Sequence, residues 1–252
     1  MDLKSEIVAA IRTGMRNACT DMHYFTAQPQ LCFNAEYLFT VATAKAINDH
    51  NYVPGHRFEI RIEQGTQKFA RDCLPLLKRG NPMIRGSSVF RGKINPKIER
   101  TGRVDIAVYH DPINRATFGS IPLCAIEVKG FNPARILVLK DLRRNLEFMR
   151  LNGPSGPSQI EFTSFAALHD ASQATDPEAI EYSLGNIRRK YNKWLSELGP
   201  LTDVITEIET FTVSSDSQGT ISEEVGEAVI DLSTHHHFVG VIVNFVRQQL
   251  HS

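Results

Sequence analysis

The sequence has no long apolar run, no clustered cysteines and no excess of one charge. Nothing approaches eighteen consecutive apolar residues, so we expect neither a membrane span nor a membrane partner. The N-terminus lacks the apolar block and cleavage site of a signal peptide, which makes a cytoplasmic location the default expectation. The cysteines have no CxxC or CxxH spacing, which favours buried small side chains over disulfides or a zinc site: Cys19, Cys32, Cys73 and Cys124.

Several motifs of common enzymes are also missing. The sequence contains no GxSxG elbow, no GxxxxGK[ST] loop and no GxGxxG fingerprint, although a Ser/His/Asp triad of another form stays open. The run His235, His236 and His237 invites a metal interpretation. Because strand side chains alternate between faces, at most His235 and His237 could share an ion. We favour a polar loop that enters the last strand.

The net charge of zero hides an uneven distribution along the chain. Residues 57–103 contain twelve Lys or Arg and four acids, whereas residues 196–231 contain nine acids and no Lys or Arg. A basic tract of this kind can meet a polyanion, so residues 57–103 are the candidate nucleic-acid face, with Phe90 and Tyr109 as candidate base-stacking or core residues. Two solvated surfaces that differ by chance explain the asymmetry equally well, and the acidic segment has no assigned role.

The apolar pattern predicts alternating helices and strands. The composition is ordinary for a globular protein, with 42% hydrophobic and 22% charged residues among 252. The predicted helices cover residues 3–18, 35–50, 66–82, 136–150 and 177–198, and the predicted strands cover residues 57–64, 103–110, 123–131, 160–168, 203–213 and 238–246. This order predicts an α/β fold, a three-layer sandwich with a mixed central sheet flanked by helices.

Two of these strands carry charges among apolar residues. In LCAIEVKG, Glu127 and Lys129 point to the same face, and Asp105 is a lone carboxylate in RVDIAVYH. If the two strands are neighbours, the two carboxylates lie side by side, where they repel and are costly to bury. Mg²⁺ or Mn²⁺ would resolve this conflict, and the lysine could orient a water for attack on phosphorus. The alternatives are an exposed ion pair, or a chance Glu-x-Lys in an unrelated α/β protein.

The stretches GRVDIAVY and CAIEVKGF resemble the PD-(D/E)XK phosphodiesterase superfamily. Its pattern is an Asp on one core strand, (Asp/Glu)-x-Lys on the next, and often an acid on the preceding core helix. Asp105, Glu127 and Lys129 match this pattern, and Glu36 is the candidate for the helical acid, although a first-turn acid can equally complement the helix dipole. Val104 stands where the signature has Pro, and the resemblance covers about residues 34–168.

The resemblance implies a restriction-endonuclease-like core within one nuclease-like domain over residues 1–252. The N-terminal helix would lie within residues 1–20, and a further helix and strands within residues 177–252. The implied function is metal-dependent hydrolysis of phosphodiester bonds, in DNA rather than RNA, for restriction, defence or repair. The rival is a catalytically inactive member of the same fold that binds nucleic acid or protein.

The resemblance also implies roles for single residues. Asp105, Glu127 and the backbone carbonyl of Val128 would hold Mg²⁺ or Mn²⁺, Glu36 would bind it directly or through water, and Lys129 would position the nucleophilic water. Restriction-like enzymes often combine two active sites, so a homodimer fits the resemblance. The helix after the Lys129 strand could add one polar residue, or could present a solvated face that touches phosphate at most: Lys140, Arg143, Arg144 and Asn145.

Overall fold

A computed structural model gives the arrangement of most of the chain. It describes residues 2–25, 36–52, 58–79, 88–90, 92, 95–110, 120–171, 176–214, 220–224, 227–231 and 237–248. The described helices are α1 (Leu3–Phe25), α2 (Glu36–Asp49), η2 (His50–Tyr52), α3 (Thr66–Cys73), α4 (Arg135–Arg150) and α5 (Pro177–Ser196). The described strands are β1 (Phe58–Gly65), β2 (Leu77–Arg79), β3 (Ser88–Phe90), β4 (Arg103–His110), β5 (Pro122–Phe131), β6 (Asn152–Gly153), β7 (Gly156–Pro157), β8 (Phe162–Asp170), β9 (Val204–Ser214), β10 (Thr220–Glu224), β11 (Glu227–Asp231) and β12 (Phe238–Arg247).

Six strands form one mixed central sheet in the order β1-β4-β5-β8-β12-β9. β5 and β8 run parallel and are connected through α4, whereas the other neighbours in the sheet are antiparallel. Short two-stranded ribbons, β2-β3, β6-β7 and β10-β11, extend from this sheet. The fold is therefore α/β with a mixed sheet, as the order of apolar segments predicts.

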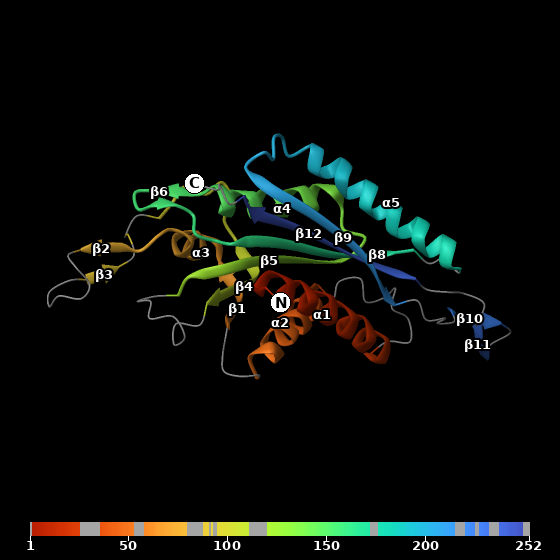
Figure 1. The fold of residues 1–252 in the computed structure, drawn as a ribbon. Helices are drawn as coiled ribbons and strands as arrows, with labels where there is room; N and C mark the ends of the chain where they lie inside the picture. Colours follow the sequence, from red (N-terminus) through yellow and green to blue (C-terminus); the bar gives the residue numbers. More distant parts are fainter. Residues whose placement is uncertain are drawn as a thin grey trace.

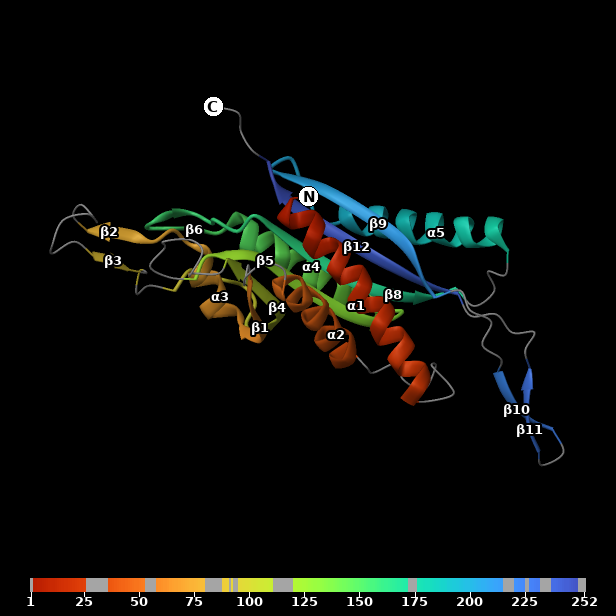
Figure 2. The same cartoon turned by 60° about the horizontal axis from the view of Figure 1, so that its bottom comes forward.

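Helices cover both faces of the sheet and make three layers (Figures 1 and 2). α1 and α2 pack on one face, where Ile126 and Val128 of β5 join their apolar cluster. α4 and α5 pack on the other face, where Ala125 of β5 joins a second cluster. Because strand side chains alternate, Glu127 and Lys129 fall on the α4 side. The two charges thus point towards a helix layer.

The α1–α2 contact depends on one glycine. A Cβ at Gly14 would lie 2.4 Å from the Cα of Thr43, far inside normal contact distance, so a larger residue would push the two helices apart. The approach helps to explain why Thr43 is buried although it is polar. The α1–α2 layer matters for the site because α2 begins at Glu36.

The extents of two predicted helices are wrong. The helix expected over residues 3–18, within residues 1–20, continues to Phe25. The expected helix over residues 66–82 ends at Cys73, and β2 follows at Leu77–Arg79. Pro75 lies between them, and a proline prevents continuation of a helix because it cannot donate the backbone hydrogen bond. β2, which falls within the expected helix, pairs antiparallel with β3.

Two expectations about composition can be compared with the described residues. Cys19, Cys73 and Cys124 are buried, as predicted, and Cys32 lies outside the described part. None of the helices in the described ranges combines the length and apolarity that a membrane crossing needs. The single-domain boundaries over residues 1–252 stay a prediction.

Candidate active site

The two strands that carry the predicted carboxylates are neighbours. β4 and β5 pair antiparallel with Ile106 opposite Ile126, and one further step along the ladder leads to Asp105 and Glu127. The N–H of Val128 donates a hydrogen bond to Asp105 Oδ2 at 2.8 Å. Asp105 therefore leans across the ladder onto the backbone beside Glu127. The pairing on which the sequence argument depended is present.

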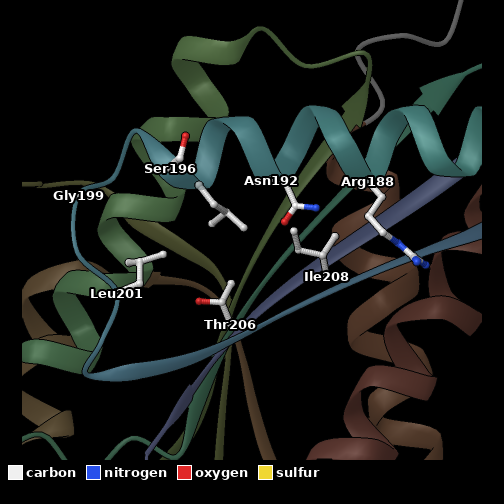
Figure 3. A pocket seen from close by; sticks show the side chains of 8 residues that line it. Arg188, Asn192, Ser196, Gly199, Leu201, Thr206 and Ile208 are labelled. Atoms are coloured by element: carbon white, nitrogen blue, oxygen red, sulfur yellow. The ribbon is translucent and has the colours of Figure 1, made fainter.

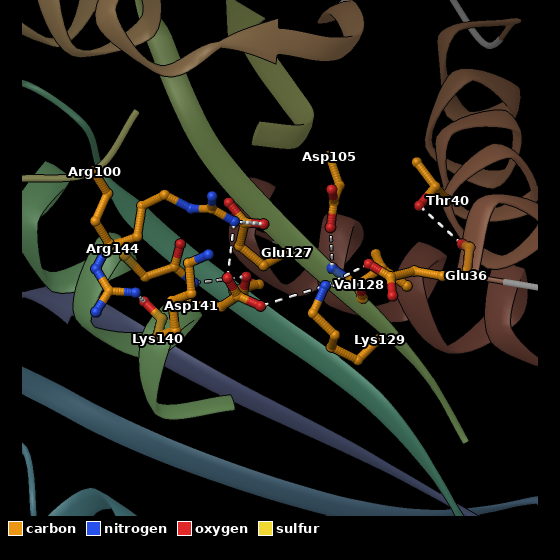
Figure 4. Close-up of polar contacts among 12 residues, drawn as sticks. Glu36, Thr40, Arg100, Asp105, Glu127, Val128, Lys129, Lys140, Asp141 and Arg144 are labelled. Atoms are coloured by element: carbon orange, nitrogen blue, oxygen red, sulfur yellow. Dashed lines mark hydrogen bonds and ion pairs between the residues drawn. The ribbon is translucent and has the colours of Figure 1, made fainter. Parts of the chain in front are cut away.

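Lys129 lies at the centre of a polar chain that joins two layers (Figure 4). Its Nζ donates to Glu36 Oε1 of α2, lies 3.4 Å from Asp141 Oδ2 of α4, and lies 3.3 Å from the Val128 carbonyl oxygen. Burial alone would lower the pKa of Lys129, but Asp141 and Glu36 outweigh burial and raise that pKa. The lysine is therefore held as a cation that can donate hydrogen bonds, and it is unsuited to act as a base near neutral pH.

Glu127 is completely buried and bonds to an arginine of α4. Arg144 Nη2 donates to Glu127 Oε2 and also to Asp141 Oδ1, the latter at 3.0 Å. The other oxygen of Glu127, Oε1, has no hydrogen-bond partner among the described residues. Burial and the nearby Asp105 raise the pKa of Glu127 well above its usual range, while Arg144 opposes this effect. Burial of the Glu127 carboxylate therefore costs folding free energy, because one of its oxygens has no hydrogen-bond partner among the described residues.

The cluster has more acidic than basic groups. Burial also raises the pKa of Asp105, against the opposing effects of the Val128 N–H and Lys129. Fully ionised, the cluster would have a net negative charge, which is the condition that a divalent cation relieves. Its four carboxylates and two cations are Glu36, Asp105, Glu127, Asp141, Lys129 and Arg144.

A pocket of about 370 Å³ opens beside this cluster. Arg144 is among the residues that line it, whereas Glu127, with 0% of its surface exposed, is not. The arginine that bonds Glu127 therefore stands at the pocket surface while the carboxylate lies behind it. The described residues that line this pocket are Glu36, Glu63, Arg103, Asp105, Lys129, Leu137, Lys140, Asp141 and Arg144.

The donor set fits a hard divalent cation in chemistry. Asp105, Glu127 and the Val128 carbonyl supply oxygen ligands of the type that Mg²⁺ prefers, and Glu127 Oε1 is a buried acceptor that lacks a partner. However, the described residues contain no group of three or more His, Cys, Asp or Glu already arranged to hold a metal ion. The obstacle is visible in the contacts, because Arg144 occupies Glu127 Oε2. Opening of that contact would free Glu127 Oε2 as a ligand.

A second pocket shows what the candidate site has that other cavities lack. It measures about 480 Å³ between α5 and β9, and Arg188 is the charged residue among the described side chains that line it (Figure 3). Arg188 bonds to Thr210 Oγ1 at 3.3 Å, a structural contact. The hydroxyl groups of Ser196 and Thr206 also line this pocket, but no carboxylate is among its described lining residues, so it offers no comparable site for a divalent cation.

A third pocket lies along α4 and involves the predicted basic segment. It measures about 490 Å³, and its charged lining residues are Lys97, Glu99, Arg100, Arg143, Glu147 and Arg150. Arg100 also donates to the Lys140 carbonyl oxygen, which ties this pocket to the rim of the candidate site. Burial and the nearby Arg143 lower the pKa of Arg100, as expected where like charges gather.

Other parts of the basic segment have structural roles. Arg61 stacks over the Tyr109 ring at 4.2 Å and pairs with Glu59 at 2.6 Å. Tyr109 is itself fully buried and donates to Asp72 Oδ2 at 3.0 Å, so it belongs to the core and is not available to stack on bases. The side chain of Phe90 lies outside the described part of the structure.

Part of the acidic segment is matched by basic residues of the same chain. Four of its acids form ion pairs with residues of α1 and α4, which explains much of the local charge without an external partner. These pairs are Lys4–Glu207 at 2.6 Å, Arg12–Glu209 at 2.6 Å, Arg150–Asp203 at 2.7 Å and Arg135–Glu197. Of the remaining acids, Glu223 and Glu224 belong to β10, Glu227 and Asp231 belong to β11, and Asp216 lies outside the described residues.

Two of the four polar residues considered on the helix after the Lys129 strand do not lie on a solvated face. Arg144 and Asn145 are buried, and Asn145 donates to the Ser164 carbonyl oxygen at 3.0 Å. Asp141, which contacts both cations of the cluster, was missed by the sequence interpretation. Its spacing of three residues from Arg144 was a usable signal, because residues at i and i+3 share one helix face.

The histidine run is described only at its end. His237 is buried at the start of the last strand, where Nε2 lies 3.0 Å from Thr212 Oγ1. His235 and His236 lie outside the described residues. The contact of His237 is that of a packed core histidine.

Comparisons with known proteins identify no relative. No protein-family model, no curated protein and no solved structure matches the chain. Function must therefore be argued from the residues of the site.

Proposed function

We propose that the chain is a metal-dependent nuclease of the PD-(D/E)XK type, which hydrolyses phosphodiester bonds in nucleic acid, with DNA as the favoured substrate. The observation that carries this proposal is the convergence of Asp105, Glu127 and Lys129 on one pocket-side cluster. These residues come from adjacent strands, and Glu36 reaches the same lysine from another layer. The cluster joins acidic oxygen ligands, a held ammonium group and a cavity open to solvent.

Each residue has a role that follows from its contacts. Asp105, Glu127 and the Val128 carbonyl would hold Mg²⁺ or Mn²⁺, which when bound supplies Lewis acidity and an acidified water. Lys129 remains protonated and donates hydrogen bonds, so it can orient a water and stabilise negative charge that develops on phosphate oxygens. Glu36 contacts Lys129, which favours a role in positioning the ammonium group over direct metal ligation.

The substrate class is supported by the basic residues beside the cluster. Arg103 and Lys140 line the candidate site, and the adjacent pocket along α4 adds Lys97, Arg100 and Arg143. Several cations on the walls of two neighbouring pockets favour a polyanionic strand over a small neutral substrate. The acids Glu99 and Glu147 in the adjacent pocket make this support weaker than that from the cluster itself.

A binding module of the same fold is the second candidate. The observation in its favour is the contact between Arg144 and Glu127, which satisfies part of the buried carboxylate without a metal ion. In a protein that has lost catalysis, such a contact would be permanent. This candidate predicts nucleic-acid or protein binding that is indifferent to Mg²⁺ and to substitution of Lys129.

The proposal is tested by cleavage of linear, circular and single-stranded DNA and of RNA with Mg²⁺, Mn²⁺ or EDTA. We expect cleavage that requires metal and falls by about 10²–10³-fold in Asp105→Ala and Lys129→Ala. The matched controls are Asp49→Ala and Lys45→Ala, an exposed ion pair of α2. Cleavage that survives both site substitutions would contradict the proposal, and folded protein without metal-dependent cleavage would favour the binding module.

A further inference from the structure

The position of Arg144 suggests that it controls access to the metal site. Its guanidinium bonds to Glu127 and Asp141, and its side chain is 9% exposed. It lines the pocket, while Glu127 does not. An ion that enters from the pocket can reach Asp105 at the pocket wall, but Glu127 lies behind its contact with Arg144.

The buried carboxylate needs a counter-cation in either state. An isolated carboxylate without a partner is strongly disfavoured in a protein interior, so Glu127 must be neutralised by a proton, a guanidinium group or a metal ion. The described contacts supply the guanidinium at Oε2 and leave Oε1 without a partner. The guanidinium of Arg144 therefore contacts only one of the two oxygens of Glu127. A divalent cation could bind the carboxylate more completely.

We propose that Arg144 is an internal counter-cation of Glu127, which a divalent metal ion displaces, and that the displaced guanidinium becomes a phosphate ligand in the pocket. This inference rests on the proposed nuclease function and gives a specific role to one of the four α4 residues that the resemblance left open. The geometry allows the exchange because Arg144 extends from α4 beside the pocket and has a second partner in Asp141. That partner can keep the guanidinium close after it leaves Glu127.

The exchange has opposite consequences for binding and for catalysis. Displacing a guanidinium costs free energy, and a positive charge near the ion repels it, so Arg144 lowers the affinity for metal. In the same protein, the released guanidinium can bind a non-bridging phosphate oxygen through paired N–H groups. Removing Arg144 should therefore strengthen metal binding and weaken cleavage, a combination that a purely structural role would not produce.

The experiment compares Mn²⁺ affinity in the wild type, Arg144→Met and Arg143→Met by calorimetry at about pH 8, where protons compete weakly for carboxylates. Arg143 is the matched control because it is the exposed neighbour on the same helix. We expect Arg144→Met to bind Mn²⁺ about tenfold more tightly, on the scale of changes next to metal ligands, and to cleave DNA more slowly. Arg143→Met should keep the wild-type affinity.

Each failure has its own signature. If the wild type binds Mn²⁺ measurably and Arg144→Met binds it equally or more weakly, the inference is overturned and the nuclease proposal stands. No Mn²⁺ binding in any folded variant overturns both. If Arg144→Met does not fold, modification of wild-type arginines by a dicarbonyl reagent replaces it. Mn²⁺ should then accelerate modification of Arg144, and an unchanged rate overturns the inference.

Discussion

Two buried polar clusters lie under the α4–α5 layer of the sheet and are built in opposite ways. One is the carboxylate cluster around Glu127, with an unpartnered oxygen and opposed charges. The other is centred on His169 of β8, whose Nε2 lies 3.1 Å from the Tyr191 hydroxyl and whose Nδ1 lies 3.3 Å from Asn132 Oδ1. In the second cluster, a neutral histidine can satisfy both nitrogens, donating through Nδ1 and accepting through Nε2.

The pKa shifts describe the same difference. Burial, helped by Lys190, lowers the pKa of His169 to about 3, so the ring is neutral and the site stable without any added ion. Burial and the nearby Asp105 raise the pKa of Glu127, and the positive charge of Arg144 opposes this rise. A cluster that satisfies its own groups stabilises the fold. A cluster that leaves an acidic oxygen unsatisfied is poised to bind something else.

The largest expected effect separates activity from stability at Asp105. Asp105→Asn should lower metal-dependent cleavage by about 10²-fold or more, because it removes an anionic ligand. The Asn side-chain oxygen can still accept the bond from the Val128 N–H. Since burial raises the pKa of Asp105, the neutral residue should leave the free energy of unfolding unchanged or slightly higher. A cleavage assay and a denaturant titration on one preparation measure the activity and the free energy of unfolding. A large loss of stability in Asp105→Asn would contradict the expected separation of activity from stability.

An intermediate effect is expected from acid on the His169 cluster. The pKa of His169 is lower in the folded state than the ordinary value of 6.5, so its stabilising contribution is complete above that value. It is lost as the pH falls from 6.5 towards the folded value, at about 1.4 kcal/mol per pH unit once the unfolded histidine is mostly protonated. Denaturant titrations at several pH values should show a shallower acid loss in His169→Gln. An identical slope in both proteins would contradict the assignment of His169 as a buried neutral group.

The smallest expected effect sharpens the same contrast at Tyr191. Tyr191→Phe keeps the packed ring and removes the hydroxyl that contacts His169, which should cost about 1 kcal/mol of unfolding free energy. Metal-dependent cleavage should stay at the wild-type level, since neither residue touches the carboxylate cluster. Reduced cleavage in a stable Tyr191→Phe protein would show that the two clusters are coupled.

The sequence was a good guide where local pattern determines structure. RVDIAVYH forms β4 at the predicted residues, and alternation correctly put Glu127 and Lys129 on one face. The helix expected over residues 66–82 is shorter in the structure, because Pro75 stands ahead of the expected end and cannot continue a helix. In each of these cases the outcome depends on neighbours in sequence.

The rest of the site depends on tertiary contacts. The side chains of Asp141 and Arg144 look like a solvated polar face until α4 is packed on β5, where they meet Glu127 and Lys129. The contact between His169 and Tyr191 joins a strand to a helix and has no local signature. These groups are buried because helices and strands distant in sequence pack against one another. The spacing of residues along the chain does not predict that packing.

The most direct test of the carboxylate cluster as a metal site is anomalous diffraction from crystals grown with Mn²⁺. The account predicts an anomalous peak within about 2.0–2.6 Å of carboxylate oxygens of Asp105 and Glu127, with Arg144 moved off Glu127. Crystals at high Mn²⁺ concentration without such a peak, and with Arg144 still bonded to Glu127, would contradict it.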